Sequence, residues 1–538
     1  MDDSHAQASL SRSNVTPELC AERGRGPRPL RNTFWPVKFL SILRIGDRHP
    51  SSAIRMLHGV TWQMAMSVLG RAGTLVIAVI QARILGKAGY GELGMVLSTL
   101  TLFGLFSNAA GGQTCTKFIA ECRSSAPVRA GRIAAMSVVI TISLSVVAVV
   151  AVVICAPTLA SRALNAPRLT PLLWLAGASL GLMALTSTFS GILMGLQLFR
   201  ADSMLRLAQI IAWLPLTAWL SWKWDTFGAM LAYTLSQAVG LAVYAIATHR
   251  ICQREGFALE FPGMWREYRV LLQFSLPMML HGFLCVPTVW LCNAILARQP
   301  SGYAALGGYT AAVQFRTVVL QVPMLIQGVV WPMMAELYGA RQSVRLASLF
   351  QTTFDVLWAV GLLAALPMVA FGSMLMSLFG RDFAADHIVM ALVMATTSVS
   401  LISGFSGVVL QVANRTWPAL YANIAYGAVS VLGALVLVPR YGALGLATAF
   451  VISTLIQAML VLLLIRASLP DLHCTGNFVL VFLSLLFCLA MLCISHAHLP
   501  HTFELRTLSL VVCAAIIWLR GLAGPARRLT RIFASPRF

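Results

Sequence analysis

Two arginines lie within long apolar stretches, where a permanent charge is costly. Arg71 lies 13 residues after His58, about 20 Å along a helix. Arg316 lies 13 residues into the apolar stretch 303–335. An arginine at bilayer depth costs roughly 2.5–3.5 kcal/mol on insertion scales and indicates function. Because a guanidinium is planar and always charged, it suits paired contacts with phosphate oxygens. We predict an anion-binding cavity at Arg71 and Arg316, with structural pairing to helix carbonyls or polar neighbours as the alternative.

Carboxylates are expected to be missing at the same depth. Glu92, Glu336 and Asp355 fall at the ends of the predicted helices. A transporter of organic cations needs a buried acid to neutralise its substrate or to exchange a proton. The charged part of the substrate is therefore predicted to be negative.

The composition is that of a membrane protein. The chain has 538 residues, of which 58% are hydrophobic and 11% charged, and a mean hydropathy of +0.80. Soluble domains carry roughly 25% charged residues, so a cytosolic enzyme and a secreted disulfide scaffold are excluded. None of the 11 cysteines has a zinc-binding spacing. We expect no disulfide, metal or cofactor. No P-loop or catalytic triad pattern occurs, so we expect no enzyme.

The chain is predicted to be an all-α integral membrane protein. A span needs about 20 mostly apolar residues, and about fourteen candidates follow one another. They are 58–82, 90–111, 134–156, 171–195, 207–222, 227–248, 270–297, 303–335, 354–378, 385–411, 417–438, 442–465, 477–494 and 507–522.

Basic residues orient these spans. With the N-terminus inside, 28 Lys and Arg lie on the cytoplasmic side and 9 on the other side. Cytoplasmic enrichment of Lys and Arg is the usual orientation signal. We therefore predict that both termini are cytoplasmic. The net charge of +21 needs no nucleic-acid partner.

An internal repeat predicts the architecture. Three matches recur in order at almost one offset: Phe189-Ser190-Gly191-Ile192 with Phe405-Ser406-Gly407-Val408 at 216, Gly228 with Gly445 at 217, and Tyr90 with Tyr309 at 219. The shift of six helices preserves orientation, which indicates parallel repeats. We predict two six-helix lobes around a central cavity, plus two C-terminal helices.

Four regions follow from this division. Residues 1–55 are predicted to be a mostly disordered basic tail, 56–250 the N-terminal lobe and 251–468 the C-terminal lobe. Residues 469–538 hold the two extra helices and a basic tail.

Other polar residues in the spans are candidates to line the cavity. Most polar side chains in membrane helices join neighbouring helices, which is the alternative for each. Tyr309 shares a helix face with Arg316, whereas Gln314 points away from it. The candidates are Tyr309, Gln314, Asn108, Asn293 and His281.

Four short segments match, in order, helix openings of a known family: Ile84–Gly91 at its second helix, Phe274–Pro277 at its seventh, Gly308–Ala312 at its eighth and Tyr441–Gly445 at its twelfth. Through these segments the chain resembles the polysaccharide and O-antigen flippases of the multidrug, oligosaccharidyl-lipid and polysaccharide exporter superfamily. The resemblance covers residues 56–466.

This resemblance implies alternating access in the bacterial inner membrane. The implied substrate is an oligosaccharide on undecaprenyl pyrophosphate, moved from the cytoplasmic to the periplasmic leaflet. Implied partners are membrane lipid, a polysaccharide polymerase and glycosyltransferases. In related flippases, arginines on the first and eighth helices face the cavity, and Arg71 and Arg316 lie on those helices.

Two alternatives to the flippase remain. One is a multidrug or small-molecule exporter or antiporter of the same fold, coupled to H⁺ or Na⁺. The other is a membrane scaffold that recruits biosynthetic enzymes through its basic tails.

Overall fold

The computed structural model describes residues 52–107, 111–122, 126–268, 276–413, 415–468, 475–496 and 502–518. Within these ranges the chain is helical and forms no strand. The predicted disorder of the N-terminal tail concerns residues almost all outside them, since only Ser52–Arg55 are described, as the start of a helix. Apart from Ser52, the described residues belong to one compact unit, Ala53–Phe538.

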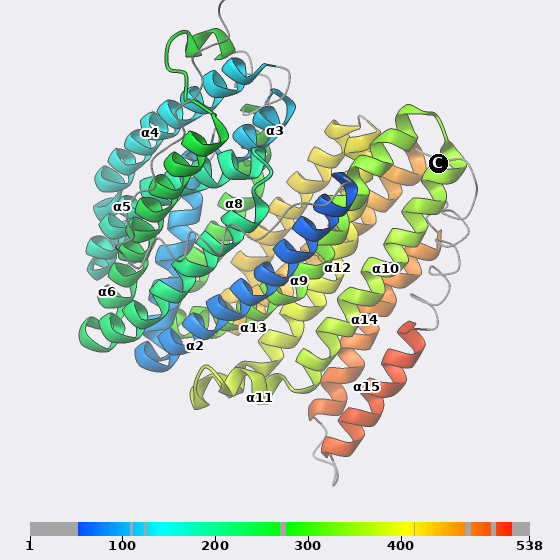
Figure 1. The fold of residues 1–538 in the computed structure, drawn as a ribbon. Coiled ribbons are helices and arrows are strands. Elements are labelled where there is room, and N and C mark those ends of the chain that lie inside the picture. Colours follow the sequence, from blue (N-terminus) through cyan, green and yellow to red (C-terminus); the bar gives the residue numbers. More distant parts are fainter. Residues whose placement is uncertain are drawn as a thin grey trace, which may run out of the picture. The chain divides into compact units, whose positions relative to one another are not determined.

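Figure 1 shows the order of the helices along the chain. The α-helices of the described ranges are α2 (Ser52–Ser107), α3 (Gly112–Cys122), α4 (Pro127–Thr158), α5 (Thr170–Gly195), α6 (Phe199–Glu255), α8 (Leu276–Ala297), α9 (Gly302–Gly339), α10 (Ser343–Ala370), α11 (Gly372–Ser377), α12 (His387–Val412), α13 (Thr416–Ser468), α14 (Thr475–His496) and α15 (Thr502–Trp518). Short 3₁₀ helices include η3 (Met264–Glu267) and η5 (Arg381–Asp386).

The helices are those of a multi-pass membrane protein. Among the described residues, eight are long and apolar enough to cross a membrane, and α8, α14 and α15 hold shorter apolar stretches. Three of the eight, α2, α6 and α13, contain a bend with non-helical backbone angles. Each of these three therefore consists of two helical segments. This arrangement is consistent with the fourteen predicted spans.

The bends of α6 and α13 have the same backbone conformation. Asp225 has φ 45° and ψ −131°, and Gly442, 217 positions later, has φ 55° and ψ −128°. After each bend a glycine packs on the preceding segment: a Cβ on Gly228 would lie 1.8 Å from the Leu220 carbonyl oxygen, and one on Gly445 would lie 2.3 Å from that of Leu437. Both helices therefore fold back at once, in the register of the predicted repeat.

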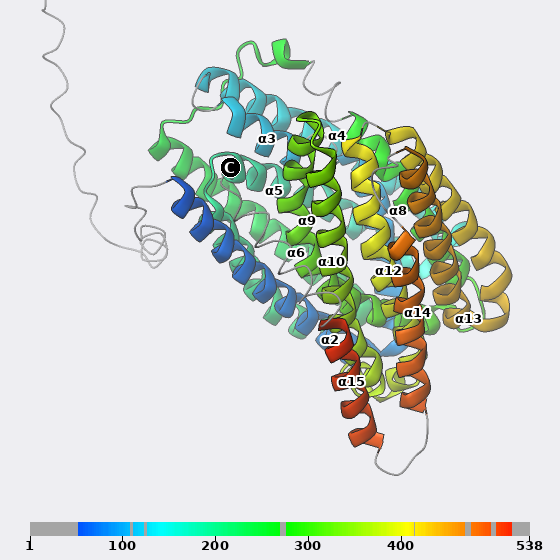
Figure 2. The same cartoon turned by 90° about the vertical axis from the view of Figure 1, so that its right-hand side faces the viewer.

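The helices pack as two bundles. In the first, α5 packs against α3, α4 and α6, and in the second, α12 packs against α9, α10 and α13. The C-terminal helices belong to the second bundle, where α14 and α15 lie side by side against α10 (Figure 2). The Trp358 indole Nε1 of α10 donates to Ser484 Oγ of α14 at 3.0 Å.

Three details differ from the sequence prediction. Residues 112–122 form α3, where a loop was expected. Helix α10 begins at Ser343, 11 residues before the predicted span, and ends at Ala370. Asp355 therefore lies 12 residues inside a helix, so its predicted position at a helix end is wrong. Apolar runs locate only the part of a helix within the membrane, whereas helices extend beyond it.

The two bundles meet backbone to backbone near the α2 bend at Gly86. A Cβ on Gly91 of α2 would lie 1.8 Å from the Tyr303 carbonyl oxygen of α9, and one on Gly307 would lie 2.0 Å from that of Lys87. Small residues allow membrane helices to approach this closely. We call this region, where α2, α6 and α13 bend, the bend end.

Side chains surround the glycine contact at the bend end. Lys87 Nζ lies 2.7 Å from Asp386 Oδ2, at the start of α12. The Tyr90 ring contacts the rings of Phe379 and Phe383, with centroids 6.0 and 6.2 Å away. Because these contacts join residues before and after position 250, they hold the two lobes together at this end.

The glycine contact predicts that any added side chain is destabilising. Gly91→Ala or Gly307→Ala should each lower the free energy of unfolding by roughly 1–3 kcal/mol, because overpacking forces the helices apart. Thermal unfolding of the purified protein in detergent measures this loss. Gly328→Ala is the matched control on α9, because its Cβ would meet no atom within 4 Å. Wild-type unfolding of both glycine variants would contradict the contact.

The ion pair between the lobes predicts a coupling that a charge swap restores. Lys87→Ala and Asp386→Ala should each destabilise the protein. The charge-swapped double variant Lys87→Asp/Asp386→Lys should regain part of the lost stability, because contacting pairs have coupling energies of about 0.5–3 kcal/mol. Arg168 and Glu92 form a control pair within the N-terminal lobe, with the arginine exposed. Breaking that pair should have a smaller effect, and equal effects from both pairs would argue against a role in joining the lobes.

The shared turn predicts opposite effects at its two copies. The conformation of Asp225 favours glycine, so Asp225→Gly should stabilise the protein by about 1 kcal/mol. Gly442→Ala should destabilise it by about 1 kcal/mol through backbone strain. Strain is the only cause here, because nothing within 4 Å would meet the new Cβ. Chemical denaturation of the detergent-solubilised variants tests both signs. Destabilisation by Asp225→Gly would contradict the strain.

Candidate functional site

Arg71 and Arg316 lie at nearly the same distance from the bend end. Arg71 is 15 residues before the Gly86 bend of α2, and Arg316 is 14 residues after Gly302, where α9 begins. At about 1.5 Å per residue these separations are roughly 22 and 21 Å. The hydrocarbon core of a bilayer is roughly 30 Å thick. Each lobe thus carries one arginine well inside the membrane.

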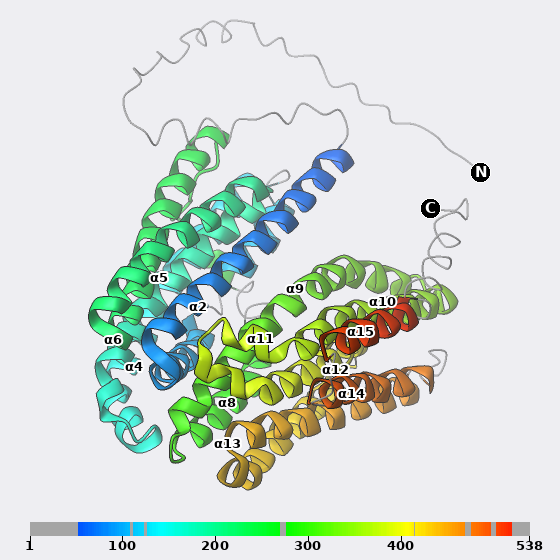
Figure 3. The ribbon, with the colours of Figure 1, turned by 90° about the horizontal axis from the view of Figure 1, so that it is seen from below.

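Arg71 contacts the helix that carries Arg316. Its Nε donates a hydrogen bond to Gln321 Oε1 of α9 at 3.0 Å, and its side chain is exposed. Two glycines beside Arg71 face α6, since added Cβ atoms on Gly70 and Gly73 would both touch Ile210. The first segment of α2 therefore lies between α6 and α9 (Figure 3), with Arg71 directed to the C-terminal lobe.

Arg316 lies beside an aromatic cluster. It interacts electrostatically with Tyr309, on its own helix, and with Tyr426 of α13. Both tyrosine rings stack with Phe450, at centroid distances of 6.1 and 6.5 Å. Within the described part of the chain, Arg316 has no hydrogen-bond or ion-pair partner. Its charge therefore faces phenol rings and partly open space.

Arg71 and Arg316 differ from the cations that form ion pairs in the described residues. The ion pairs of the described residues lie close to helix ends or bends and each contain a carboxylate. Among the residues that the structure describes, Arg71 bonds to a neutral amide and neither Arg71 nor Arg316 pairs with a carboxylate. The four pairs are Lys87–Asp386, Arg129–Glu267, Arg168–Glu92 and Arg206–Asp202.

Two other predicted site residues join the lobes. Gln314 Nε2 donates to the Tyr90 hydroxyl of α2 at 3.4 Å, and Asn293 Nδ2 donates to Ser98 Oγ at 3.2 Å. Tyr309 lies on the side of Arg316, as its spacing indicated. Asn108 and the side chain of His281 lie outside the described residues.

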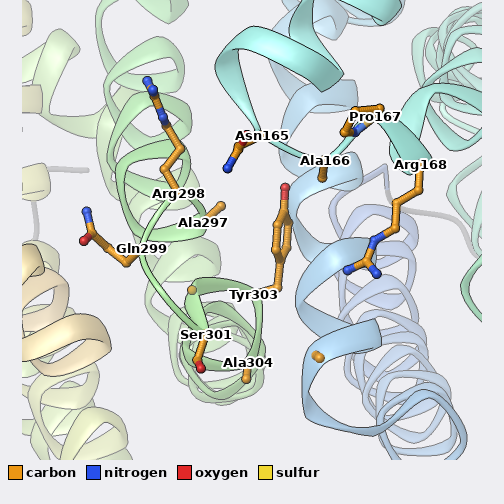
Figure 4. A pocket seen from close by; sticks show the side chains of 12 residues that line it. Asn165, Ala166, Pro167, Arg168, Ala297, Arg298, Gln299, Ser301, Tyr303 and Ala304 are labelled. Atoms are coloured by element: carbon orange, nitrogen blue, oxygen red, sulfur yellow. The ribbon is translucent and has the colours of Figure 1, made fainter.

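A cavity of about 530 Å³ opens near the bend end, between residues 165–168 and 297–304. Figure 4 shows Arg168 and Arg298 on opposite sides of Tyr303. Arg168 is paired with Glu92, and the Tyr303 hydroxyl donates to the Leu164 carbonyl at 2.9 Å. Arg168 lies in a short 3₁₀ helix (Pro167–Leu169) and Arg298 in the turn after α8, so this cavity is distinct from the predicted mid-depth site.

A buried acid was missed by the sequence analysis. Asp202, in the first turn of α6, is 1% exposed and accepts hydrogen bonds from Ser190 and from the Tyr244 hydroxyl. Arg206 pairs with it at 3.3 Å. The spacing of Asp202 and Arg206 was a signal for an ion pair on one helix face. The repeat offset gave no second signal, because position 419 is alanine.

Comparison with known proteins gives one matching family and several similar folds. The family model for polysaccharide biosynthesis proteins matches residues 56–338, more than half of the chain. No curated protein matches the sequence.

Three solved structures resemble this one. The lipid II flippase MurJ, in an inward closed conformation, has a TM-score of 0.65 at 10% identity, covering 88% of this chain and 99% of MurJ. An inward-facing multidrug resistance transporter of the MATE family has a TM-score of 0.63 at 15% identity, covering 78% and 99%. A transporter from Pyrococcus furiosus, described as having a binding pocket of reversed polarity, has a TM-score of 0.55 at 14% identity, covering 78% and 95%. The chain therefore belongs to the polysaccharide biosynthesis protein family and has the fold of MOP superfamily transporters.

Proposed function

We propose that this protein is a flippase for a lipid-linked oligosaccharide and carries out transport rather than catalysis. Its substrate is a sugar repeat unit on undecaprenyl pyrophosphate, destined for exopolysaccharide, capsule or O-antigen. It acts in the bacterial inner membrane with both termini in the cytoplasm. A polysaccharide polymerase and glycosyltransferases are its proposed partners.

One observation carries this proposal: each lobe places an arginine at nearly the same depth, and among the described residues neither arginine has a carboxylate partner. Two uncompensated charges in a membrane are costly unless an anion joins them. A pyrophosphate supplies two negative groups, and each guanidinium can bind phosphate oxygens in pairs. Family membership and the similarity to a lipid II flippase support the same substrate class.

The contacts of the lobes support a path for the pyrophosphate. In the predicted orientation the bend end faces the periplasm, where the Gly91–Gly307 and Lys87–Asp386 contacts hold the lobes together. Rocking of the lobes would break these contacts and separate Arg71 from Gln321. The anion held between the arginines would then face the periplasmic leaflet.

A multidrug exporter is the second candidate, and Asp202 favours it. A buried carboxylate is what a cation exporter needs, and MATE transporters share the fold. Arg206 neutralises this carboxylate, however, whereas none of the ion pairs among the described residues includes Arg71 or Arg316. The flippase accounts for all three observations.

Arg71→Ala and Arg316→Ala should each reduce surface polysaccharide about tenfold or more, because each removes a charge-assisted contact worth roughly 1.5–3 kcal/mol. Lysine at either position should rescue only in part, since it restores charge without the guanidinium fork. Polymer quantification, with immunoblots of membrane protein, measures this. Arg440→Ala, exposed at the bend end of α13, is the matched control.

Analysis of lipid extracts from a deletion strain distinguishes the candidates. A flippase predicts accumulation of lipid-linked sugar, which the wild-type gene removes and the two alanine variants do not. Wild-type polymer in both alanine variants would contradict the anion site. Increased drug sensitivity without lipid-linked sugar would favour the exporter.

A further inference from the structure

The N-terminal lobe contains a second cavity, apart from Arg71 and Arg316. It has a volume of about 230 Å³ and lies among α5 and the two segments of α6. We call it the α5–α6 pocket. Its polar and aromatic lining includes Thr186, Ser187, Ser190, Gln209, Trp213 and Gln237. Drug-sized ligands occupy pockets of roughly 300–1,000 Å³, so this pocket suits a smaller molecule.

The two glutamines form a fixed polar wall. Gln209 Nε2 donates to Gln237 Oε1 at 2.9 Å, across the two segments of α6. Gly240 makes room for this arrangement, because a Cβ there would lie 2.6 Å from the Gln209 side chain. Each amide retains a donor or an acceptor beyond this bond. The wall therefore offers both kinds of hydrogen bond in a preset position.

The pocket carries no net charge. Arg206 lies at its mouth with an exposed side chain and pairs with the buried Asp202. The same arginine donates to Ser190 Oγ at 2.9 Å, and Ser190 in turn donates to Asp202. Since carboxylate and guanidinium compensate each other, neither a phosphate nor a free cation is favoured here. A neutral, hydroxyl-rich ligand fits this chemistry.

An aromatic ring supplies the remaining wall. Trp213 is held by an edge-on contact with Tyr233, with ring centroids 5.4 Å apart at 65°. Aromatic walls with a few fixed polar groups are typical of small-ligand sites. A pyranose ring has both hydroxyl edges and an apolar C–H face, so it can use the glutamines and the indole together.

The pocket lies next to the proposed pyrophosphate site. Ile210, which lines it, touches Gly70 and Gly73 on either side of Arg71. A sugar attached to a pyrophosphate at Arg71 would thus be within one helix diameter of the pocket, roughly 10–12 Å.

The C-terminal lobe does not repeat Gln209 and Arg206 of this pocket. At the repeat offset of 217, Gln209 corresponds to Tyr426 and Arg206 to Asn423. In the C-terminal lobe Tyr426 stacks on Phe450 beside Tyr309. Aromatic packing there takes the place of the Gln209–Gln237 pair, and the amide pair of that lobe, Gln457 with Asn423, lies at other positions.

We infer that the α5–α6 pocket is a subsite for one neutral hexopyranose unit of the transported glycan, held by Gln209, Gln237 and Trp213. The inference rests on the proposed function for the link to transport. Sugar binding itself can be measured without transport.

Saturation-transfer NMR on the full chain in lipid nanodiscs tests this, with glucose, galactose and N-acetylglucosamine as separate probes. At least one sugar should show a signal with wild-type protein. Gln237→Leu and Trp213→Leu should each weaken its affinity about tenfold, the equivalent of roughly 1.4 kcal/mol. The melting temperature of each variant shows whether it is folded, and the second variant serves if the first is not.

Two controls make the result specific. Gln457→Ala removes the amide pair with Asn423 (2.8 Å) in the other lobe and should leave the signal unchanged. Arg440→Ala, near the bend of α13 in the other lobe, should also retain it. No signal from any of the three sugars, or equal signals from folded pocket variants, would overturn the subsite. Stabilisation by Na⁺ that Asp202→Asn abolishes, without a sugar signal, would assign the pocket to a cation and also overturn it.

The proposed function can fail independently. If the deletion strain accumulates no lipid-linked sugar, the flippase proposal fails whatever the NMR shows. If it does accumulate the lipid and the pocket variants bind sugar normally, only the subsite fails.

Discussion

The contact of Gly91 with α9 and of Gly307 with α2 sets the distance between the two lobes. Because a Cβ on either glycine would overlap a carbonyl oxygen of the facing helix, the backbones touch with no side chain between them. The surrounding groups depend on this approach: Lys87 reaches Asp386, and Tyr90 reaches Gln314. Membrane helices gain little from hydrophobic burial against each other, so such packing and hydrogen bonds must hold them together. The same weakness allows the lobes to separate.

Charged residues form ion pairs at the bend end, whereas Arg71 and Arg316, deeper in the membrane, have no carboxylate partner among the described residues. At the bend end the cations Lys87 and Arg168 pair with carboxylates, and their fields largely cancel. Roughly 20 Å deeper along the helices, Arg71 bonds to Gln321 and Arg316 lies near Tyr309, both neutral side chains. A low dielectric strengthens an uncompensated charge, so in the proposed function the two deep arginines attract an anion more strongly than the paired outer cations do. The proposed alternating access combines this attraction at mid-depth with closure at the bend end.

The sequence predicted the fold better than the site, for physical reasons. Apolar runs and the offset of about 217 predicted the spans and the repeat, and Asp225 and Gly442 now share one backbone conformation. Hydropathy cannot show where a helix extends past the membrane, so α3 and the first turns of α10 were missed. The predicted position of Asp355 at a helix end was wrong, because it lies 12 residues inside α10. The buried Asp202 was missed, because its partners Ser190 and Tyr244 are 12 and 42 residues away. Contacts between helices decide burial, and spacing along one helix does not reveal them.

The two lobes have kept one backbone and exchanged side chains. Gly228 packs on Leu220 and Gly445 on Leu437 in the same way. The chain therefore reverses direction through the same tight turn in both lobes. Between these turns, however, the N-terminal lobe places Gln209 where the C-terminal lobe places Tyr426. Backbone symmetry allows the lobes to rock about a common axis, and side-chain asymmetry gives each a different surface. The proposed substrate, with an anionic link, a sugar and a lipid, is itself asymmetric, so a symmetric cavity would bind it poorly. Different side chains on one shared backbone frame would satisfy both demands.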